Sequence, residues 1–310
     1  EITKHSWCVT HEPAVIFTHT DGMLGLPLPE PGGSLSLLRP FINTSEAHFK
    51  LFTACLVGAT NPDGPFPVLV FEGSQGTGKS TIARMFRAII DPSQAPIRSA
   101  PSEDRDLLVA AQKSWLLAYD NLSRVTEWLS DAFCRISTGG GYSCRQLYSD
   151  TGETILQAKR PIILNGIYSL IERHDLLDRA IRIELEPIPE DSRRLEKDLW
   201  AEFEKLHPKI LGAVCDAVSA ALANEKSIEL DGLPRMADFA AWVTAAEPVL
   251  PWQKGEFIKV YKAYHENIVE LEIYSDLVAS TIIRLMSNRF EWQGTPTELL
   301  KELEALVSED

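Results

Sequence analysis

The sequence has few of the residues that would support a disulfide framework or a resident metal site. Its 310 residues include five cysteines, an odd number, and no two of them form a CxxC pair. The seven histidines are equally scattered along the chain. This spacing disfavours disulfides and zinc and indicates a reducing compartment, so we expect a cytoplasmic protein.

Basic residues and long apolar runs are also scarce. Lys and Arg number 30 against 44 Asp and Glu, which gives a formal net charge of −14. A protein that coats duplex DNA with its whole surface is usually basic, so any nucleic-acid site here must be local, such as a pore or one loop. No apolar run approaches the roughly 18 residues that a membrane span needs, so we expect no membrane partner.

The chain begins with Glu1 and carries no signal-peptide pattern, which is typical of a piece excised from a longer protein. Its length leaves room for one core of about 200 residues and a smaller second domain. A Pro/Gly-rich stretch at residues 26–33 indicates that residues 1–44 form an N-terminal appendage or linker.

Residues 73–80 contain the most informative pattern in the chain, GxxxxGK[ST], which is that of the phosphate-binding P-loop. Its glycines let backbone N–H groups turn inward around phosphates, Lys79 can reach the β/γ-phosphate oxygens, and Ser80 can place its hydroxyl on Mg²⁺. The residues expected to contact the nucleotide are Gly73, Ser74, Gln75, Gly76, Thr77, Gly78, Lys79, Ser80 and Thr81.

The residues around this loop support the same interpretation. Residues 67–71 are a short apolar run of the kind that a buried parallel strand needs, and residues 81–87 continue at helical period. A strand, a Gly-rich turn and a helix N-terminus together make an anion site. The pattern arises by chance in roughly one chain in a hundred of this length, so an ordinary Gly-rich turn is disfavoured. We expect ATP and Mg²⁺ as the cofactors.

A carboxylate ends the next long apolar run, residues 115–119. Asp120 is the natural Walker B residue, which would hold Mg²⁺ together with Ser80; the alternative is a simple turn former. Asn121 follows, where many ATPases of this type carry an acid that activates water. An Asn can orient a water but cannot take its proton, so either hydrolysis is slow or the base is another residue, with Glu72 and Asp104 as candidates.

Two further residues complete the predicted catalytic set. Asn165 ends the strand predicted at residues 160–166 and could hold the attacking water, although Asn at a strand end is also a common turn former. Arg179 lies between a short helix and the last predicted strand, where it could reach a neighbouring subunit's γ-phosphate as an arginine finger. The competing interpretations are Arg173 or Arg182 as the finger, or a surface ion pair with Asp175 or Asp178.

Strands alternate with helices through residues 45–189, which predicts an α/β core with a mostly parallel, doubly wound sheet. Two alternating runs around a turn at residues 150–153 predict a β-hairpin inserted at about residues 139–159. After residue 189 strand signals nearly vanish. We expect a helical lid at residues 190–250, whose long helix breaks or kinks at Pro208, and a C-terminal helical region at residues 251–310.

In this order of motifs the chain resembles an AAA+ ATPase. The inserted hairpin resembles that of superfamily 3 helicases, such as papillomavirus and polyomavirus initiators, and residues 119–165 look closest to the ATPase/helicase modules of phage and mobile-element primase–helicases. The resemblance implies Asn165 as sensor 1, Arg179 as the arginine finger, and Arg235 as sensor 2 at the start of a lid helix. The alternative for Arg235 is an arginine near a helix start that nearby acidic residues cap. It also implies a homo-oligomeric ring, with a hexamer expected, a preceding primase or initiator domain, and a C-terminal winged helix that would include residues 292–295.

In a ring helicase the hairpin would grip DNA phosphates in the pore. The candidate residues for contacts with single-stranded DNA are Arg145, Gln146, Tyr148 and Lys159. The predicted tip at residues 150–153 is acidic, however, which disfavours phosphate contact there and leaves the flank of the hairpin.

Two classes of function follow from these residues. The first is an ATP-driven DNA motor, a helicase or translocase. The second is a non-motor AAA+ switch, a loader or defence ATPase that remodels a protein partner, and the acidic tip and Asn121 favour it. A P-loop kinase is a third alternative, disfavoured because the hairpin and the arginine after Asp178 would have no role in it.

Overall fold

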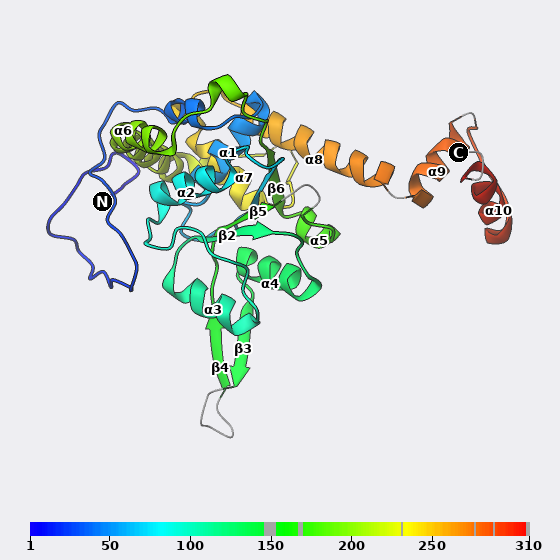
Figure 1. The fold of residues 1–310 in the computed structure, drawn as a ribbon, viewed down its shortest axis with the longest axis horizontal. Helices are drawn as coiled ribbons and strands as arrows, with labels where there is room; N and C mark the ends of the chain where they lie inside the picture. Colours follow the sequence, from blue (N-terminus) through cyan, green and yellow to red (C-terminus); the bar gives the residue numbers. More distant parts are fainter. Residues whose placement is uncertain (146–152, 167–169, 231, 276, 288, 308–310) are drawn as a thin grey trace. The chain divides into compact units, whose positions relative to one another are not determined.

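The structure, a computed structural model, describes residues 1–145, 153–166, 170–230, 232–275, 277–287 and 289–307. The chain divides into two compact units, Glu1–Val260 and Tyr261–Asp310. The first unit contains the parallel sheet and the residues predicted to bind the nucleotide, so the candidate site lies in it (Figure 1).

The first unit is built on a four-stranded sheet in which every strand pair is parallel. The strand order is β2 (Leu117–Leu122), β5 (Ile162–Gly166), β1 (Val68–Glu72), β6 (Ala180–Glu184). Beside β2, a single parallel bridge joins Arg98 to Tyr119. Because all the strands run the same way, their carboxyl ends share one edge of the sheet and their amino ends share the other.

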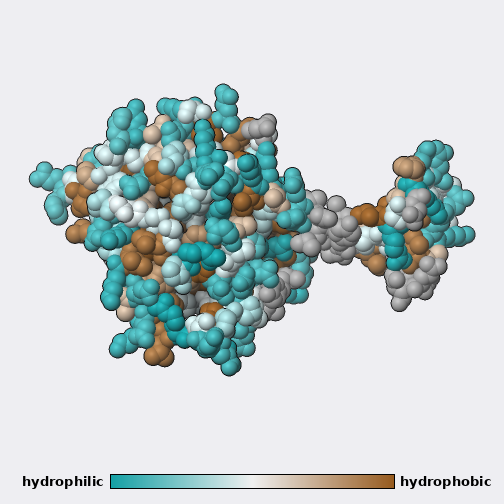
Figure 2. All heavy atoms as spheres, turned by 90° about the horizontal axis from the view of Figure 1, so that it is seen from above, coloured by the Kyte–Doolittle hydropathy of each residue, from teal (hydrophilic) through white to brown (hydrophobic). Residues whose placement is uncertain are grey.

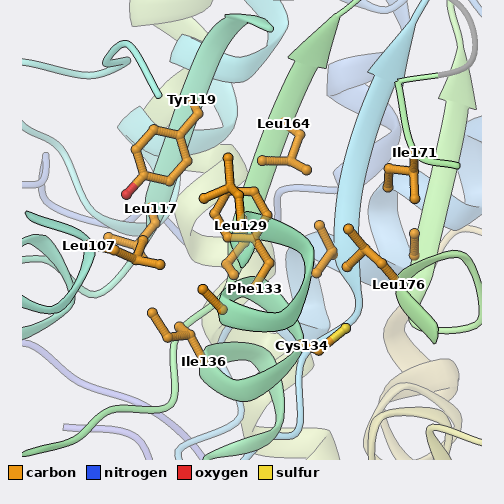
Figure 3. Close-up of a cluster of buried hydrophobic side chains, with 14 of the residues drawn as sticks. Leu107, Leu117, Tyr119, Leu129, Phe133, Cys134, Ile136, Leu164, Ile171 and Leu176 are labelled. Atoms are coloured by element: carbon orange, nitrogen blue, oxygen red, sulfur yellow. The ribbon is translucent and has the colours of Figure 1, made fainter. Parts of the chain in front are cut away.

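Helices cover both faces of this sheet, as the alternating pattern predicts. On one face lie α3 (Asp104–Lys113), α4 (Glu127–Thr138) and α5 (His174–Leu177), whose buried side chains join those of the strands in one cluster (Figure 3). The Tyr119 ring stacks on the Phe133 ring with 5.7 Å between centroids. The observed α/β architecture therefore agrees with the predicted fold class.

The opposite face is covered by α1 (Glu46–Gly58) and α2 (Lys79–Ile90). Aromatic packing joins these helices to the sheet, because the Phe52 ring of α1 lies 6.0 Å from Phe71 of β1 and 5.5 Å from Phe86 of α2. The α2 helix thus begins at the carboxyl end of β1 and is held there by a buried core.

The predicted hairpin is present as an antiparallel pair, β3 (Gly141–Arg145) and β4 (Glu153–Gln157). Its register places Arg145 opposite Glu153 and Gly141 opposite Gln157. The turn that joins the two strands falls outside the described residues, so the acidic tip remains a sequence prediction.

Long helices follow the sheet, in agreement with the predicted lid. They are α6 (Glu196–Asn224), α7 (Ala237–Ala246) and α8 (Glu256–Ser275), and four short 3-10 helices accompany the core: η1 (Leu35–Phe41), η2 (Glu190–Ser192), η3 (Glu225–Ser227) and η4 (Glu247–Val249). Of the break or kink that the sequence predicts at Pro208, the break is wrong, because α6 continues through this residue. Burial of the helix on the C-terminal side of Pro208, including Ile210 and Val214, offsets the hydrogen bond that proline removes.

Residues 30–41 of the N-terminal segment pack against α6, and Glu30 lies close to Pro208. The Glu30 N–H donates to the Pro208 carbonyl at 2.9 Å, and a Cβ built on Gly212 would lie 1.8 Å from the Glu30 carbonyl oxygen. Farther along the chain, the Phe41 ring packs edge-on against Phe203 of α6 at 5.8 Å. Residues 30–41, which the sequence assigns to a linker, are therefore packed against the lid helix.

The second unit includes α9 (Leu277–Met286) and α10 (Pro296–Val307). A capping box opens α10, since the Thr295 N–H donates to Glu298 Oε2 at 2.7 Å and the Glu298 N–H donates to Thr295 Oγ1 at 3.4 Å. The described residues between 261 and 307 form helices and no strand, so the wing of the expected winged helix does not occur among them.

One helical stretch in the described part of the chain, Glu196–Ser227, is long and apolar enough to cross a membrane by length and composition alone. Of its most apolar window, 56% is buried inside the protein, and a core helix is apolar for that reason. On the face that Figure 2 shows, hydrophobic patches are separated by hydrophilic side chains.

The packing of α6 on α2 generates a prediction about pH and stability. His207 of α6 lies against Phe203, and burial lowers the pKa of its imidazole to about 4, although a hydrogen bond with the Ala88 backbone opposes this shift. The unfolded chain, with a His pKa near 6.5, then binds more protons than the folded protein between about pH 4 and 6.5. Stability should therefore fall as the pH drops through this range, by roughly 2 kcal/mol between pH 7 and 4.5 from this group alone.

Urea unfolding at the two pH values measures this loss. The His207→Gln variant, which cannot titrate, should lose less stability over the same interval than the wild-type protein. An equal loss in both proteins would mean that His207 does not carry the effect.

Candidate nucleotide-binding site

The glycine-rich loop at residues 73–80 follows β1 directly and leads into the first turn of α2. Gly76 and Gly78 both have φ of +86°, a left-handed conformation that side chains rarely adopt. A Cβ on Gly73 would lie 2.7 Å from the Leu185 carbonyl oxygen and 2.9 Å from Thr77 Oγ1. The glycine positions of the motif are therefore required by the backbone itself.

The N-terminus of α2 is free to receive an anion. Its N-cap residue is Gly78, and no side chain caps the helix. The first N–H groups of the helix therefore keep their hydrogen-bonding capacity, and the helix dipole adds a partial positive charge at the same point. Together they make a site for a phosphate group.

Lys79 spans this loop. Its ammonium donates to the carbonyl oxygens of Gly73 at 2.7 Å and of Ser74 at 2.8 Å. Burial lowers the pKa of Lys79, and the negative charge of Asp120 opposes this shift. The cation is thus held at the mouth of the loop, beside the carboxylate that the sequence assigns to Mg²⁺.

Asp120 and Asn165 lie side by side because they are at the carboxyl ends of the adjacent strands β2 and β5. The Asn165 amide donates from Nδ2 to Asp120 Oδ1 at 3.1 Å. Asn165 is 1% exposed, and its Oδ1 is buried without a hydrogen-bond partner among the described residues. That oxygen is an open acceptor, which suits the orientation of a water.

Asn121 lies in a strained part of β2. The pairing of β2 with β5 shifts between Tyr119 and Leu122, and Asn121 has φ of +56°. Asn tolerates this left-handed conformation better than longer side chains do, because its short amide can bond to nearby backbone. The backbone therefore favours Asn at position 121, where the sequence resemblance to ATPases would place an acidic residue.

These residues surround one pocket of about 510 Å³, which is within the usual range for small-molecule sites. The lining residues are Gln75, Gly76, Thr77, Gly78, Lys79, Ser80, Thr81, Asp120, Asn121, Leu122, Asn165 and Gly166. Leu122 and Gly166 were not predicted from the sequence, although each lies within two positions of a predicted strand-end residue.

The donor set of this pocket fits a nucleoside triphosphate with Mg²⁺. The helix N-terminus and Lys79 supply positive charge for phosphates, while the Ser80 hydroxyl and the Asp120 carboxylate are oxygen ligands of the kind that Mg²⁺ prefers. Groups of three or more His, Cys, Asp or Glu side chains that could hold a metal alone do not occur in the described part of the chain.

The two alternative bases lie outside the pocket. Glu72 is 7% exposed, and burial raises the pKa of its carboxyl. Glu72 lies on the same face of the sheet as Val70, which packs in the core beneath α4. Asn165, which lines the pocket, pairs with Phe71 and lies on the opposite face. Asp104 is exposed at the start of α3 and lies 3.8 Å from Arg135.

The predicted arginines also lie outside the pocket. Arg179 donates from Nη1 to the Asp175 carbonyl at 2.5 Å, and Arg235 pairs with Asp178 at 2.6 Å. The two alternative candidates for the arginine finger have other surroundings. Arg173 contacts the carboxylates of Asp131 at 3.1 Å and Asp175 at 3.4 Å. Arg182 lies within β6.

Of the predicted DNA contacts, Gln146 and Tyr148 lie outside the described residues. Arg145 is at the last position of β3, opposite Glu153 in the register. Lys159 lies at the base of the hairpin, where its ammonium donates to the Asp63 carbonyl.

Comparison with known proteins gives a family and a fold. A family model described as "Actinomycete integrative conjugative element replication protein" matches residues 35–266. Comparison with curated proteins gives no significant match.

Among solved structures, the chain is similar to an apo structure of the NrS-1 C-terminal region, with 12% identity and a TM-score of 0.51. An A-form apo structure of the same region matches with 14% identity and a TM-score of 0.51. Each match covers 95% of this chain and 71% of the other chain, and at these identities the likeness concerns the fold alone.

The pocket yields a prediction about nucleotide binding. Lys79→Ala should sharply weaken ATP binding, because no other cationic side chain lines the described pocket. Asp120→Asn should retain much of the binding but lose its Mg²⁺ dependence. Calorimetric titration with ATP, with and without Mg²⁺, measures both effects. Lys205→Ala, which removes an exposed lysine of α6, is the matched control and should bind like the wild-type protein. Wild-type affinity in Lys79→Ala would remove the loop from the site.

Proposed function

The chain belongs to the family of actinomycete integrative conjugative element replication proteins, and we propose that it is an ATP-hydrolysing, oligomeric DNA motor of such an element. The proposed activity is that of a helicase or translocase in the cytoplasm, working with a primase or initiator part of the same replication system. The family supports the replication role, and the chemistry of the pocket supports the motor.

One observation carries this proposal. A single pocket brings together a loop for phosphates, a lysine, a hydroxyl–carboxylate pair for Mg²⁺, and a buried amide that can orient water: Lys79, Ser80, Asp120 and Asn165. A binding site for a phosphate alone would need only the loop. With a nucleoside triphosphate bound, the added groups would serve the γ-phosphate and its attacking water, which is the arrangement that hydrolysis requires.

Hydrolysis in this proposal needs an arginine from another copy of the chain. The described lining of the pocket has Lys79 as its cation and no arginine, while Arg179 lies outside it. An arginine finger raises NTP hydrolysis by a factor on the order of 10³–10⁵, so a lone subunit would turn over slowly. A closed ring, with a hexamer expected, supplies the residue to every site through one repeated interface.

The inserted hairpin would carry the contact with single-stranded DNA. A local contact of this kind is compatible with the net charge of −14, which disfavours binding over the whole surface. Of the residues predicted to contact DNA, Arg145 is the one that lies at the end of a described strand, β3.

A second candidate function is a switch that binds ATP, oligomerises and remodels a protein partner. Three observations favour it: Asn121 cannot accept a proton from water, Arg145 is paired with the acidic Glu153 in the hairpin register, and the Lys159 ammonium donates to the Asp63 carbonyl. ATPase rates with and without single-stranded DNA separate the two functions. A motor should hydrolyse ATP faster when DNA is present, whereas a rate that DNA leaves unchanged would favour the switch.

The hairpin register sharpens the test of DNA contact. Arg145→Ala should weaken binding of single-stranded DNA and lower the slope of log K against log salt by about 0.7, the value for one lost phosphate contact. Glu153→Gln should strengthen binding, because it removes the negative charge of the residue that is paired with Arg145 in the register. DNA affinity over a salt series measures both variants, with Arg193→Ala as the control for a lost surface arginine. Unchanged affinity and slope in both hairpin variants would exclude the hairpin as the DNA site.

A further inference from the structure

Arg235 contacts the residue that directly precedes Arg179, although the two arginines are far apart in the sequence. Arg235 Nη1 lies 2.6 Å from Asp178 Oδ2, and Asp178 directly precedes Arg179. The side chains of Arg235 and Asp178 are 47% and 43% exposed, so a neighbouring molecule can reach them. The sequence resemblance assigns Arg179 to the nucleotide of a neighbouring subunit and Arg235 to the nucleotide of its own subunit. In the fold, however, Arg235 contacts the residue next to Arg179.

The direction of the strands determines how far Arg235 and Asp178 lie from the nucleotide pocket of their own subunit. The Val68 N–H donates to the Arg179 carbonyl at 2.8 Å, and Val68 pairs with Ala180, so Arg179 lies at the amino end of β1. Gly73 follows the carboxyl end of the same strand. The four steps between Val68 and Glu72 span about 13 Å, at roughly 3.3 Å a residue. Arg235, held at Asp178, is therefore across the sheet from the loop that would hold its own nucleotide.

The ion pairs at this surface distinguish Arg235 from Arg173. Arg173 contacts two carboxylates, those of Asp131 and Asp175. Among the described residues, Arg235 pairs with the carboxylate of Asp178, and exposed pairs of this kind are weak because water and salt screen them. An incoming triphosphate, with several negative charges, can replace that carboxylate as the partner of Arg235.

We infer that Arg235 acts together with Arg179 on the nucleotide bound by a neighbouring copy of the chain, and not on the nucleotide of its own subunit. The inference rests on the proposed ATPase function and assigns a second arginine to its intersubunit contact. Arg235 is then a catalytic residue that contacts the γ-phosphate of the neighbour. Asp178 is a positioning residue that holds the guanidinium next to Arg179 until the neighbour's nucleotide arrives.

Mixed oligomers separate this arrangement from one in which Arg235 serves its own subunit. Arg235→Ala alone should lower ATP turnover by more than about tenfold, as the loss of a transition-state arginine does. Mixing it equally with Lys79→Ala should restore turnover, because about a quarter of the interfaces then combine an intact loop with an intact arginine pair. If Arg235 served its own subunit, no site in this mixture would contain both residues, and turnover would stay low.

A second mixture gives the opposite outcomes. Mixing Arg235→Ala with Arg179→Ala should restore nothing, because every subunit then presents an incomplete pair to its neighbour. If Arg235 served its own subunit, about a quarter of the sites would contain both arginines, and turnover would recover. Recovery in this mixture, or its absence in the first with mixed oligomers verified by dual-tag capture, would overturn the inference. Arg193→Ala, an exposed arginine paired with Glu190, should behave like the wild-type protein throughout.

A binding measurement keeps the inference testable if the protein does not hydrolyse ATP, a result that would count against the proposed function alone. Affinity for a fluorescent non-hydrolysable ATP analogue is measured at protein concentrations below and above oligomer formation. Arg235→Ala should bind like the wild-type protein when monomeric and more weakly when oligomeric. A weaker affinity already in the monomer would place Arg235 in its own site and overturn the inference.

Discussion

The common direction of the four strands is the constraint on which the rest of this structure depends. It gathers the residues after β1, β2 and β5 at one edge, where the glycine-rich loop meets Asp120 and Asn165. It also leaves the residues before β6 at the other edge, where Arg179 lies beside Val68. One strand length separates the two edges. In the proposed ATPase, the loop and the arginines of one subunit would therefore belong to different nucleotides, and a complete site would need a second copy.

The local electrostatics explain how an acidic chain can hold a polyanion. The net charge of −14 repels phosphate at long range, and salt screens that repulsion within roughly 8–10 Å. At short range the N-terminus of α2 and Lys79 present donors at fixed positions. Lys79 is already ordered across the loop carbonyls, so binding exchanges these neutral partners for charged phosphate oxygens. Preorganised donors of this kind favour binding without reorganisation of the site.

The parts of the candidate site whose positions follow from the sequence are those set by local chemistry. The loop is encoded by contiguous residues, and its glycines are required by positive φ at Gly76 and Gly78. Asp120 and Asn165 could be paired in advance because each ends an apolar strand, and parallel strands bring their ends together. No feature of the sequence predicts the left-handed backbone at Asn121. It depends on the register shift between β2 and β5, which only the assembled sheet determines.

The parts that could not be predicted depend on long-range packing. Continuity of α6 through Pro208 follows from burial of the residues after it and from a backbone contact with Glu30, far away in the sequence. Arg235 has a lid-helix position that suits a role in its own site, and its contact with Asp178 appears only when the lid packs on the core. The engagement of Lys159 by Asp63 is of the same kind. In each case a residue's type suggests its chemistry, while a distant segment decides its partner.

In the proposed motor, β5 joins the DNA element to the nucleotide. The hairpin leads through Ala158 and Lys159 into β5, and β5 ends with Asn165 in the pocket. Arg160 fixes this base, because its guanidinium donates to the carbonyls of Ala111 and Ser114 and lies 5.3 Å from the Trp115 ring. A central strand held on both sides by parallel neighbours moves as a rigid element. A displacement of the hairpin base would therefore reach Asn165, and through its amide Asp120, without any change in the loop that binds the phosphates.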